Sequence, residues 1–237
     1  MRPEHVTIPV GAARRVSGLL LRPPTARACY VMAHGAGAGM THPSMDTVAV
    51  GLAECGIATL RFQFPFMEQG TKRPDPPPLA HATVRAAVAE AGRLAPDIPL
   101  VAGGRSFGGR MTSQAQALEP MPGVNGLVFL AFPLHPAKRP SSERAKHLFD
   151  VDLPMLFLQG TRDPLAELEQ LDPLMHQLGS RTTFHLIEAA DHSFHAPPRS
   201  GRTDTEVMRE LLDAFAAWVD AVLLKAQVGT QGPASPA

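Results

Sequence analysis

The feature that most constrains the fold is a regular alternation of apolar runs and amphipathic segments from residue 28 onward. Residues 28–33 and 57–62 are apolar almost throughout, which is typical of strands that are covered on both faces. The segments between such runs carry apolar residues at helical spacing. We therefore expect a doubly wound α/β fold, with a mostly parallel sheet of about eight strands, helices on both faces and no large cap domain.

The expected elements extend over nearly the whole chain. Residues 5–10 and 17–22 are expected to form an antiparallel hairpin, and the proline-rich residues 65–78 a loop. Further strands are expected at 28–33, 57–62, 100–102, 126–132, 154–158 and 182–187, and helices at 43–55, 80–94, 111–118, 165–178 and 204–225. Residues 1–226 are expected to form one domain. The tail at 227–237, rich in Gly, Pro and Ser, is expected to be disordered.

Composition excludes several classes of function. The 237 residues include 22 basic and 22 acidic side chains, so no net field favours nucleic acid or a membrane surface as partner. The two cysteines, Cys29 and Cys55, cannot build a disulfide framework and are expected to be free thiols. The N-terminus lacks the apolar core of a signal peptide, and no run reaches membrane-spanning length. We expect a soluble cytoplasmic protein, whose oligomeric state the sequence leaves open.

A serine flanked by glycines stands between a predicted strand and a predicted helix, in the sequence PLVAGGRSFGGRM at residues 99–111. In a Gly-x-Ser-x-Gly turn of this kind, strained backbone angles lift the serine above the edge of the sheet. A Cβ atom at Gly104 or Gly108 would collide with the neighbouring strand or helix. The helix that follows points free N–H groups and its positive end at the site. The pattern predicts that Ser106 is a nucleophile.

A serine hydroxyl needs a base to take its proton, and a histidine base needs a carboxylate to hold its tautomer. Asp163 follows the predicted strand at 154–158, and His192 follows the last predicted strand. Both side chains are therefore expected at the carboxyl edge of the sheet, near Ser106. The order Ser, Asp, His along the chain is the order found in α/β-hydrolases.

Each of these partners has an alternative in the sequence. Asp163 precedes a proline and could instead stabilise a turn, in which case Asp150 and Asp152 are the reserve carboxylates. His195 lies three residues after His192 and competes with it as the base. His192 is preferred because it lies nearer the end of the strand.

Two cofactor interpretations are weaker. Asp191, His192 and His195 could form a metal site, but no further cluster of ligands supports it. The glycines of residues 35–39 could form a dinucleotide-binding turn, but the third glycine is misplaced. The next strand also ends in Arg-Phe-Gln, at residues 61–63, where that turn requires an acidic residue. We expect neither a metal nor a cofactor.

The glycine-rich residues after His34 have a second interpretation. In this interpretation, the backbone N–H groups of Phe107 and Ala36, with Gly37 as the alternative to Ala36, form an oxyanion hole, which receives the negative oxygen of a tetrahedral intermediate. His34 itself is interpreted as a structural histidine that supports the turn.

Several motifs of this chain resemble those of the α/β-hydrolase superfamily, over residues 5–226. They are HGAGAGM (34–40), RFQFPFME (61–68), GGRSFGGRM (103–111), QGTRDP (159–164) and ADHSFH (190–195). The chain is most similar to a compact branch without a cap domain, which includes the testis-expressed hydrolase-like proteins and lies near the dienelactone hydrolases. The resemblance implies a triad of Ser106, Asp163 and His192 with an oxyanion hole at Ala36 and Phe107. Dienelactone hydrolases carry cysteine where this chain has Ser106, so their substrate is not carried over.

The expected function is that of a serine hydrolase of the esterase or thioesterase type. A small ester or thioester would acylate Ser106, with His192 as general base and acid and Asp163 orienting it. The alternative is a non-catalytic hydrolase-like scaffold that binds a protein or a metabolite.

Two expectations about substrates follow from the polar segment at residues 135–152. The segment is too short to roof a large apolar pocket, so short acyl groups should be preferred over long ones. Its basic side chains predict a preference for anionic esters, since positive charge beside a site attracts anions. The charged residues are Lys138, Arg139, Arg144 and Lys146, with Glu143 as the only acid before Asp150.

Overall fold

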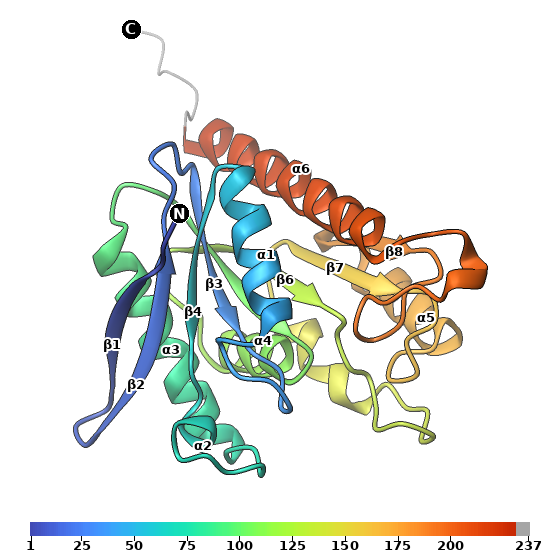
Figure 1. The fold of residues 1–237 in the computed structure, drawn as a ribbon, viewed down its shortest axis with the longest axis horizontal. Coiled ribbons are helices and arrows are strands. Elements are labelled where there is room, and N and C mark those ends of the chain that lie inside the picture. Colours follow the sequence, from blue (N-terminus) through green and yellow to red (C-terminus); the bar gives the residue numbers. More distant parts are fainter. Residues whose placement is uncertain (231–237) are drawn as a thin grey trace, which may run out of the picture.

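The computed structural model describes residues 1–230, and side chains through Leu224. One sheet with the strand order β1-β2-β4-β3-β5-β6-β7-β8 runs through the molecule (Figure 1). The strands are β1 Glu4–Val10, β2 Arg14–Leu21, β3 Ala28–Ala33, β4 Ile57–Phe62, β5 Leu100–Arg105, β6 Val124–Leu130, β7 Met155–Gly160 and β8 Thr182–Ile187. The helices are α1 Pro43–Glu54, α2 Pro65–Glu68, α3 Pro77–Leu94, α4 Phe107–Leu118, α5 Leu168–Leu178 and α6 Asp204–Thr230, with 3₁₀ turns η1 Glu143–Asp150, η2 Gly179–Arg181 and η3 Pro198–Ser200.

The sheet is mostly parallel. β1 pairs antiparallel with β2, and β2 antiparallel with β4, which confirms the predicted hairpin at the N-terminus. All further neighbours, from β4 through β3 and β5 to β8, pair in parallel. The carboxyl ends of β3, β5, β7 and β8 therefore meet at one edge of the sheet. The predicted doubly wound α/β fold with about eight strands is confirmed.

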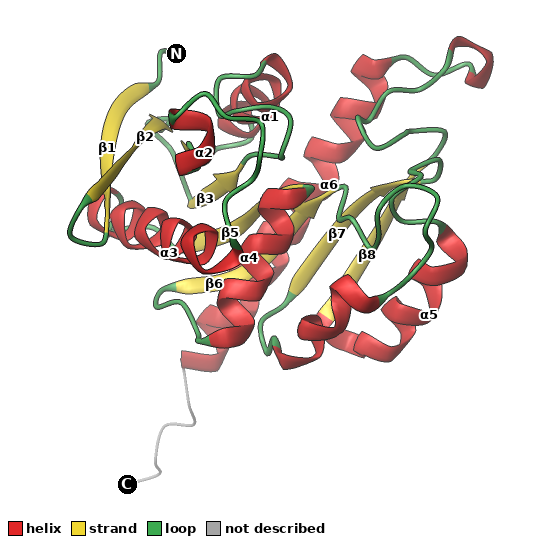
Figure 2. Ribbon diagram, turned by 90° about the horizontal axis from the view of Figure 1, so that it is seen from below, coloured by secondary structure: helices red, strands yellow, loops and turns green. Residues whose placement is uncertain are grey.

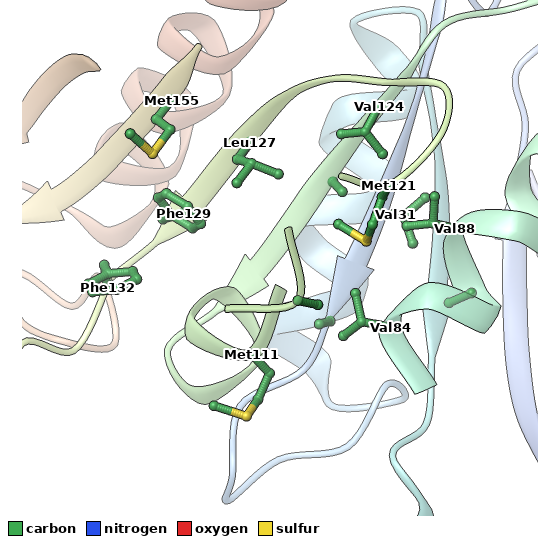
Figure 3. Close-up of a cluster of buried hydrophobic side chains, with 14 of the residues drawn as sticks. Val31, Val84, Val88, Met111, Met121, Val124, Leu127, Phe129, Phe132 and Met155 are labelled. Carbon is green, nitrogen blue, oxygen red and sulfur yellow. The ribbon is translucent and has the colours of Figure 1, made fainter. Parts of the chain in front are cut away.

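Helices cover both faces of this sheet (Figures 1 and 2). On one face α3, α4 and α5 pack over a core that includes Val31 and Phe129 from the strands and Val84 and Met111 from the helices (Figure 3). On the other face α1 and α6 pack over a second core. The side chains of β3 alternate between the two cores, as the period of two in a strand requires.

The long helix α6 is fixed to the sheet by large aromatic side chains. Trp218, the only tryptophan of the chain, is 7% exposed and lies against Gly126 on β6. A Cβ atom at Gly126 would lie 2.6 Å from Cη2 of Trp218, so the absence of a side chain makes room for the indole. Phe215 packs edge-on against Tyr30, with 4.9 Å between the ring centres. Both side chains belong to the second core, so one face of α6 is buried against the sheet.

Several boundaries differ from those predicted around the prolines and glycines. β5 continues through its two glycines to Arg105, and α4 begins at Phe107 instead of Met111. The proline-rich segment holds the short helix α2, and α3 begins at Pro77. In both helices a proline stands in the first turn, where its missing N–H leaves no hydrogen bond unmade.

The C-terminal boundary also differs. α6 extends to Thr230, so the predicted disordered tail begins inside this helix at 227–230, and its remainder at 231–237 lies outside the described residues. No large cap domain is inserted between β6 and β7. The short turn η1 occupies that connection and buries Ala145 and Leu148.

Two further observations bear on the expectations from composition. Cys29 and Cys55 are free, and burial raises the pKa of Cys29 to about 12. None of the helices within residues 1–230 is both long enough and apolar enough to cross a membrane.

Candidate active site

Ser106 occupies the sharp turn between β5 and α4. Its backbone angles are φ 49° and ψ −115°, a conformation that residues with a side chain rarely adopt. The turn is held because the N–H of Ser106 donates to the carbonyl of Leu130 at 3.0 Å, and the N–H of Arg110 donates to the carbonyl of Ser106 at 3.1 Å. The strained serine predicted from the glycine pattern is therefore present.

The two glycines of the pattern allow the backbone around this turn to pack closely. A Cβ atom at Gly104, where φ is +151°, would lie 2.2 Å from the carbonyl oxygen of Ala33. A Cβ atom at Gly108 would lie 2.5 Å from the carbonyl oxygen of His34. The end of β3 thus passes directly beside the serine turn, and no larger residue fits at either position.

The structure brings together the three side chains that the sequence proposed as a triad. Nε2 of His192 lies 2.9 Å from Oγ of Ser106, and Nδ1 of His192 lies 2.7 Å from Oδ2 of Asp163. The residues follow β5, β7 and β8, so the shared carboxyl edge of parallel strands is what assembles them. A carboxylate can only accept a hydrogen bond, so Nδ1–H is the donor and Nε2 is left to accept the serine proton.

Asp163 is held on both of its oxygens. Oδ2 also accepts from Nε2 of Gln159 at 2.5 Å, and Oδ1 accepts from the N–H of Leu165 at 2.8 Å. The side chain of Asp163 is fully buried, so these donors replace the water it would otherwise need. Gln159 stands in a motif quoted from the sequence, but no role was predicted for it. A polar residue within an apolar strand was the available signal.

Arg105, the residue directly before Ser106, contacts the loop that carries His192. Its guanidinium donates to Oγ of Ser44, at the start of α1, at 2.7 Å, and to the carbonyl of His192 at 3.4 Å. Burial lowers the pKa of Arg105, while the carboxylates of Asp191 and Asp163 act in the opposite direction. Sequence reasoning gave Arg105 no role, because its partners are distant along the chain.

The alternative base and the two reserve carboxylates make other contacts. The side chain of His195 is 56% exposed, and its Nδ1 lies 2.9 Å from a carboxylate oxygen of Asp204, which raises its pKa. Asp152 is exposed and pairs with Arg181 at 3.4 Å, and Asp150 is also exposed. Neither reserve carboxylate contacts His192.

The turn after β3 is held by His34. Nδ1–H of this buried ring donates to the carbonyl of Gly35 at 2.7 Å, and Nε2 accepts from the N–H of Phe64 at 3.0 Å. Burial lowers the pKa of His34 to about 4, so the ring is neutral near pH 7. The structural interpretation of His34 agrees with these contacts.

This contact also orients the proposed oxyanion donor. The carbonyl of Gly35 and the N–H of Ala36 belong to one trans peptide group, so they point in opposite directions. Because the carbonyl faces His34, the N–H of Ala36 points away from it. A Cβ atom at Gly35 would lie 3.9 Å from Cβ of Ser106, so the turn runs beside the serine. The second proposed donor, the N–H of Phe107, opens α4 and has no acceptor within that helix.

The far end of the same turn is fixed at Met40. Its N–H donates to Oε1 of Gln63 at 2.9 Å, and its carbonyl accepts from the guanidinium of Arg61 at 3.2 Å. Arg61 is almost fully buried and pairs with Asp46 on α1 at 3.1 Å. In the sequence, Arg61 and Gln63 stand at the non-acidic end of a predicted strand and within the motif RFQFPFME, and neither has a predicted role. Their side chains attach the glycine-rich turn to the sheet.

A metal site is not assembled in the described part of the chain. No three His, Cys, Asp or Glu side chains within it come together in a way that could hold an ion. Asp191 instead accepts from the N–H groups of Ser193 and His195, at 2.7 and 3.0 Å, and so shapes the loop that carries His192.

The parallel sheet and the arrangement at its carboxyl edge define an α/β hydrolase. The sequence model of the alpha/beta hydrolase domain family matches residues 26–220, and the chain belongs to this family. Three solved structures, each 21% identical to it, are similar over 92% of this chain. The first is a dienelactone hydrolase from Anabaena variabilis, of which 97% is covered with a TM-score of 0.74. The second is an alpha-beta serine hydrolase homologue from Coxiella burnetii, with 97% covered and a TM-score of 0.72. The third is an a/b serine hydrolase without lid from Xanthomonas campestris, with 95% covered and a TM-score of 0.71. At this identity the likeness shows the fold.

Proposed function

We propose that the protein is a serine hydrolase that cleaves a small ester or thioester through an acyl-enzyme on Ser106. The observation that carries this proposal is the pair of hydrogen bonds from Ser106 Oγ to His192 and from His192 to Asp163, at 2.9 and 2.7 Å. Two of the similar structures are described as serine hydrolases, which supports the same chemistry.

In the first half of the reaction, Oγ of Ser106 attacks the carbonyl carbon of the substrate. Nε2 of His192 takes the hydroxyl proton, and Asp163 stabilises the imidazolium that forms. The carbonyl oxygen becomes negative and accepts from the N–H groups of Ala36 and Phe107. Each such donor typically contributes about 3–4 kcal/mol to the stability of the transition state.

The tetrahedral intermediate then collapses. The bond between the acyl carbon and the leaving oxygen or sulfur breaks, and His192 passes its proton to the leaving alcohol or thiol. In the second half, His192 takes a proton from water while that water attacks the acyl-enzyme. The proton returns to Ser106 as the carboxylic acid leaves, so the enzyme is restored with one water consumed.

The test of the proposal is labelling with a fluorophosphonate, which reacts only with an activated serine. We expect mass spectrometry to find the label on Ser106 of the wild-type protein and no label on a folded Ser106→Ala variant. A folded wild-type protein that takes up no label, and hydrolyses no p-nitrophenyl ester, would contradict the proposal and favour the non-catalytic scaffold.

The connection between β6 and β7 sets an expectation for the acyl group. It contains only η1 and no inserted cap, so nothing in it encloses a long chain. We expect kcat/KM to be higher for p-nitrophenyl esters of two to four carbons than for those of ten or more. Higher kcat/KM for the long esters would contradict a shallow site.

We also propose that residues 1–226 form a single domain, because one sheet connects β1 to β8 and α6 packs on β6, β7 and β8. A chain that ends at residue 226 should then unfold in one cooperative transition and retain fluorophosphonate labelling. Two separate transitions would contradict this proposal.

A further inference from the structure

Arg110 is a half-buried arginine in the first turns of α4, four residues after Ser106. Side chains on a helix lean toward its N-terminus, which here is the end that carries the serine. Accordingly, Cζ of Arg110 lies over the ring of Phe107, 5.9 Å from its centre. The guanidinium of Arg110 thus lies toward the N-terminal end of α4, the end that follows Ser106.

Within the part of the chain that the structure describes, no protein acceptor faces the guanidinium of Arg110. Among the described side chains and backbone it makes neither a hydrogen bond nor an ion pair, and its Nε is buried without a partner. The ring of Phe107 lies near the guanidinium but cannot accept its N–H groups in the way that an oxygen does. Arg105, five residues earlier, differs because Ser44 and His192 supply acceptors for it. Solvent or a ligand therefore supplies the acceptors for the terminal N–H groups of Arg110.

The surroundings of Arg110 are positive or neutral. η1 packs on α4 and brings Arg144 close, and α3 packs on α4 and carries His81. Burial, and then the charge of Arg144, lower the pKa of Arg110, and no carboxylate acts on it. Burial, and then Arg110, lower the pKa of His147 to about 4; burial also lowers the pKa of His81. Both histidines are neutral near pH 7, so the two arginines form a positive site between α3, α4 and η1.

The basic side chains of the segment at residues 135–152 differ in their surroundings. Lys138 and Arg139 are exposed, and Lys146 pairs with Glu143 at 2.7 Å. Arg144 alone is half-buried and close enough to affect the charge on α4. Arg110, which had no predicted role, lies four residues after Ser106, on the helix that Arg144 approaches.

We propose that Arg110, with Arg144 beside it, binds a carboxylate of the substrate, so that the preferred esters carry a free carboxylate a few bonds from the scissile carbonyl. This inference rests on the proposed serine hydrolase activity. A planar guanidinium can hold a carboxylate through two parallel N–H···O bonds, which fixes orientation as well as charge. Arg110 is therefore assigned as a residue that determines specificity.

The test compares two esters of equal size, mono-p-nitrophenyl glutarate and the neutral p-nitrophenyl ester of glutaramic acid. We expect kcat/KM of the wild-type protein to be about 10- to 100-fold higher for the anionic ester at low ionic strength, as for a hydrogen-bonded charge pair. In Arg110→Gln the ratio should fall toward 1, and Arg110→Lys should restore part of it. A wild-type ratio near 1, or a ratio that Arg110→Gln leaves unchanged, would overturn the inference.

A matched control removes the same charge at the opposite edge of the sheet. Arg93 lies near the end of α3 and pairs only with Glu90, one turn earlier, at 2.6 Å. Arg93→Gln should keep the wild-type preference for the anionic ester. If it reduced the preference as much as Arg110→Gln, net charge alone would explain the result and the binding site would be refuted.

A binding measurement separates this inference from the proposed activity. Calorimetric titration of the Ser106→Ala protein with monomethyl glutarate needs no turnover. We expect binding that weakens at least tenfold when Arg110→Gln is added, and weaker binding of neutral dimethyl glutarate. If Ser106 takes no label, the hydrolase proposal fails while this titration still decides the role of Arg110. Binding that is equal with and without Arg110 would overturn the inference alone.

Discussion

Two histidines lie at the same edge of the sheet, His34 after β3 and His192 after β8, and their rings have different hydrogen-bond partners. Both ring nitrogens of His34 are occupied by backbone groups, and the ring is fully buried. The ring of His192 lies between a carboxylate and a hydroxyl, with its side chain 23% exposed.

The comparison shows that position in the fold does not decide the role of a histidine. At the His34 turn, burial and backbone partners hold the ring neutral and fix the shape of a loop. At the His192 loop, a buried carboxylate and an accessible hydroxyl leave one nitrogen able to exchange a proton. The predictions below test this contrast.

The largest effect is expected at His192. We expect His192→Ala and Ser106→Ala each to lower kcat for p-nitrophenyl acetate by about three orders of magnitude or more, because base and nucleophile act as one unit. The double variant should then be hardly worse than either single variant. Effects that multiply in the double variant would show that the two residues act independently.

A smaller loss is expected from His34→Ala. Removing the ring frees the peptide that carries the N–H of Ala36, so we expect kcat to fall by about 10- to 100-fold with a smaller change in KM. Ser106 should still react with fluorophosphonate. The unpaired N–H of Phe64 should also lower the free energy of unfolding by about 1–3 kcal/mol, measured in urea. A loss of activity as large as that of His192→Ala would make His34 part of the chemistry.

The pH dependence of stability separates the histidines further. The pKa of His34 is about 4 in the folded protein and near its ordinary 6.5 in the unfolded chain, so the unfolded chain takes up the proton first as the pH falls. Its contribution is therefore complete above about pH 6.5 and is lost as the pH falls toward 4, by about 3 kcal/mol. His34→Asn should make the decrease in unfolding free energy over this range shallower. An unchanged slope would contradict the assignment.

The smallest effect is expected at His195. Its exposed ring pairs with Asp204 and does not contact Ser106, so His195→Ala should change kcat/KM by less than about threefold. If His195→Ala were the inactive variant and His192→Ala an active one, the proposed base would be wrong.

The sequence predicted the strands better than the helix starts. β3, β4 and β8 have the predicted bounds, because their apolar or β-branched runs end at abrupt changes of composition. β5 was predicted too short, because Gly103 and Gly104 suggested a turn although both residues continue the strand pairing with β6. α2 was missed because prolines suggested a loop.

The three side chains proposed for the site could be predicted from the sequence, because each one follows a predicted strand. Ser106, Asp163 and His192 each follow a strand, and parallel strands share an edge. The supporting residues were not accessible, since Arg105 contacts the carbonyl of His192 and Gln63 fixes the glycine-rich turn at Met40, both through segments distant along the chain. The sequence could not predict the surroundings of Arg110 either, because they are formed by α3 and η1, which are distant from α4 along the chain.

The packing of the single tryptophan provides a built-in optical reporter. Trp218 is buried between α6 and β6, and none of its described contacts involves Ser106, Asp163 or His192. Its emission should therefore shift to the red when α6 separates from the sheet and stay unchanged when only the chemistry is altered. Every variant proposed above can be checked for folding by fluorescence in the same cuvette in which its activity is measured.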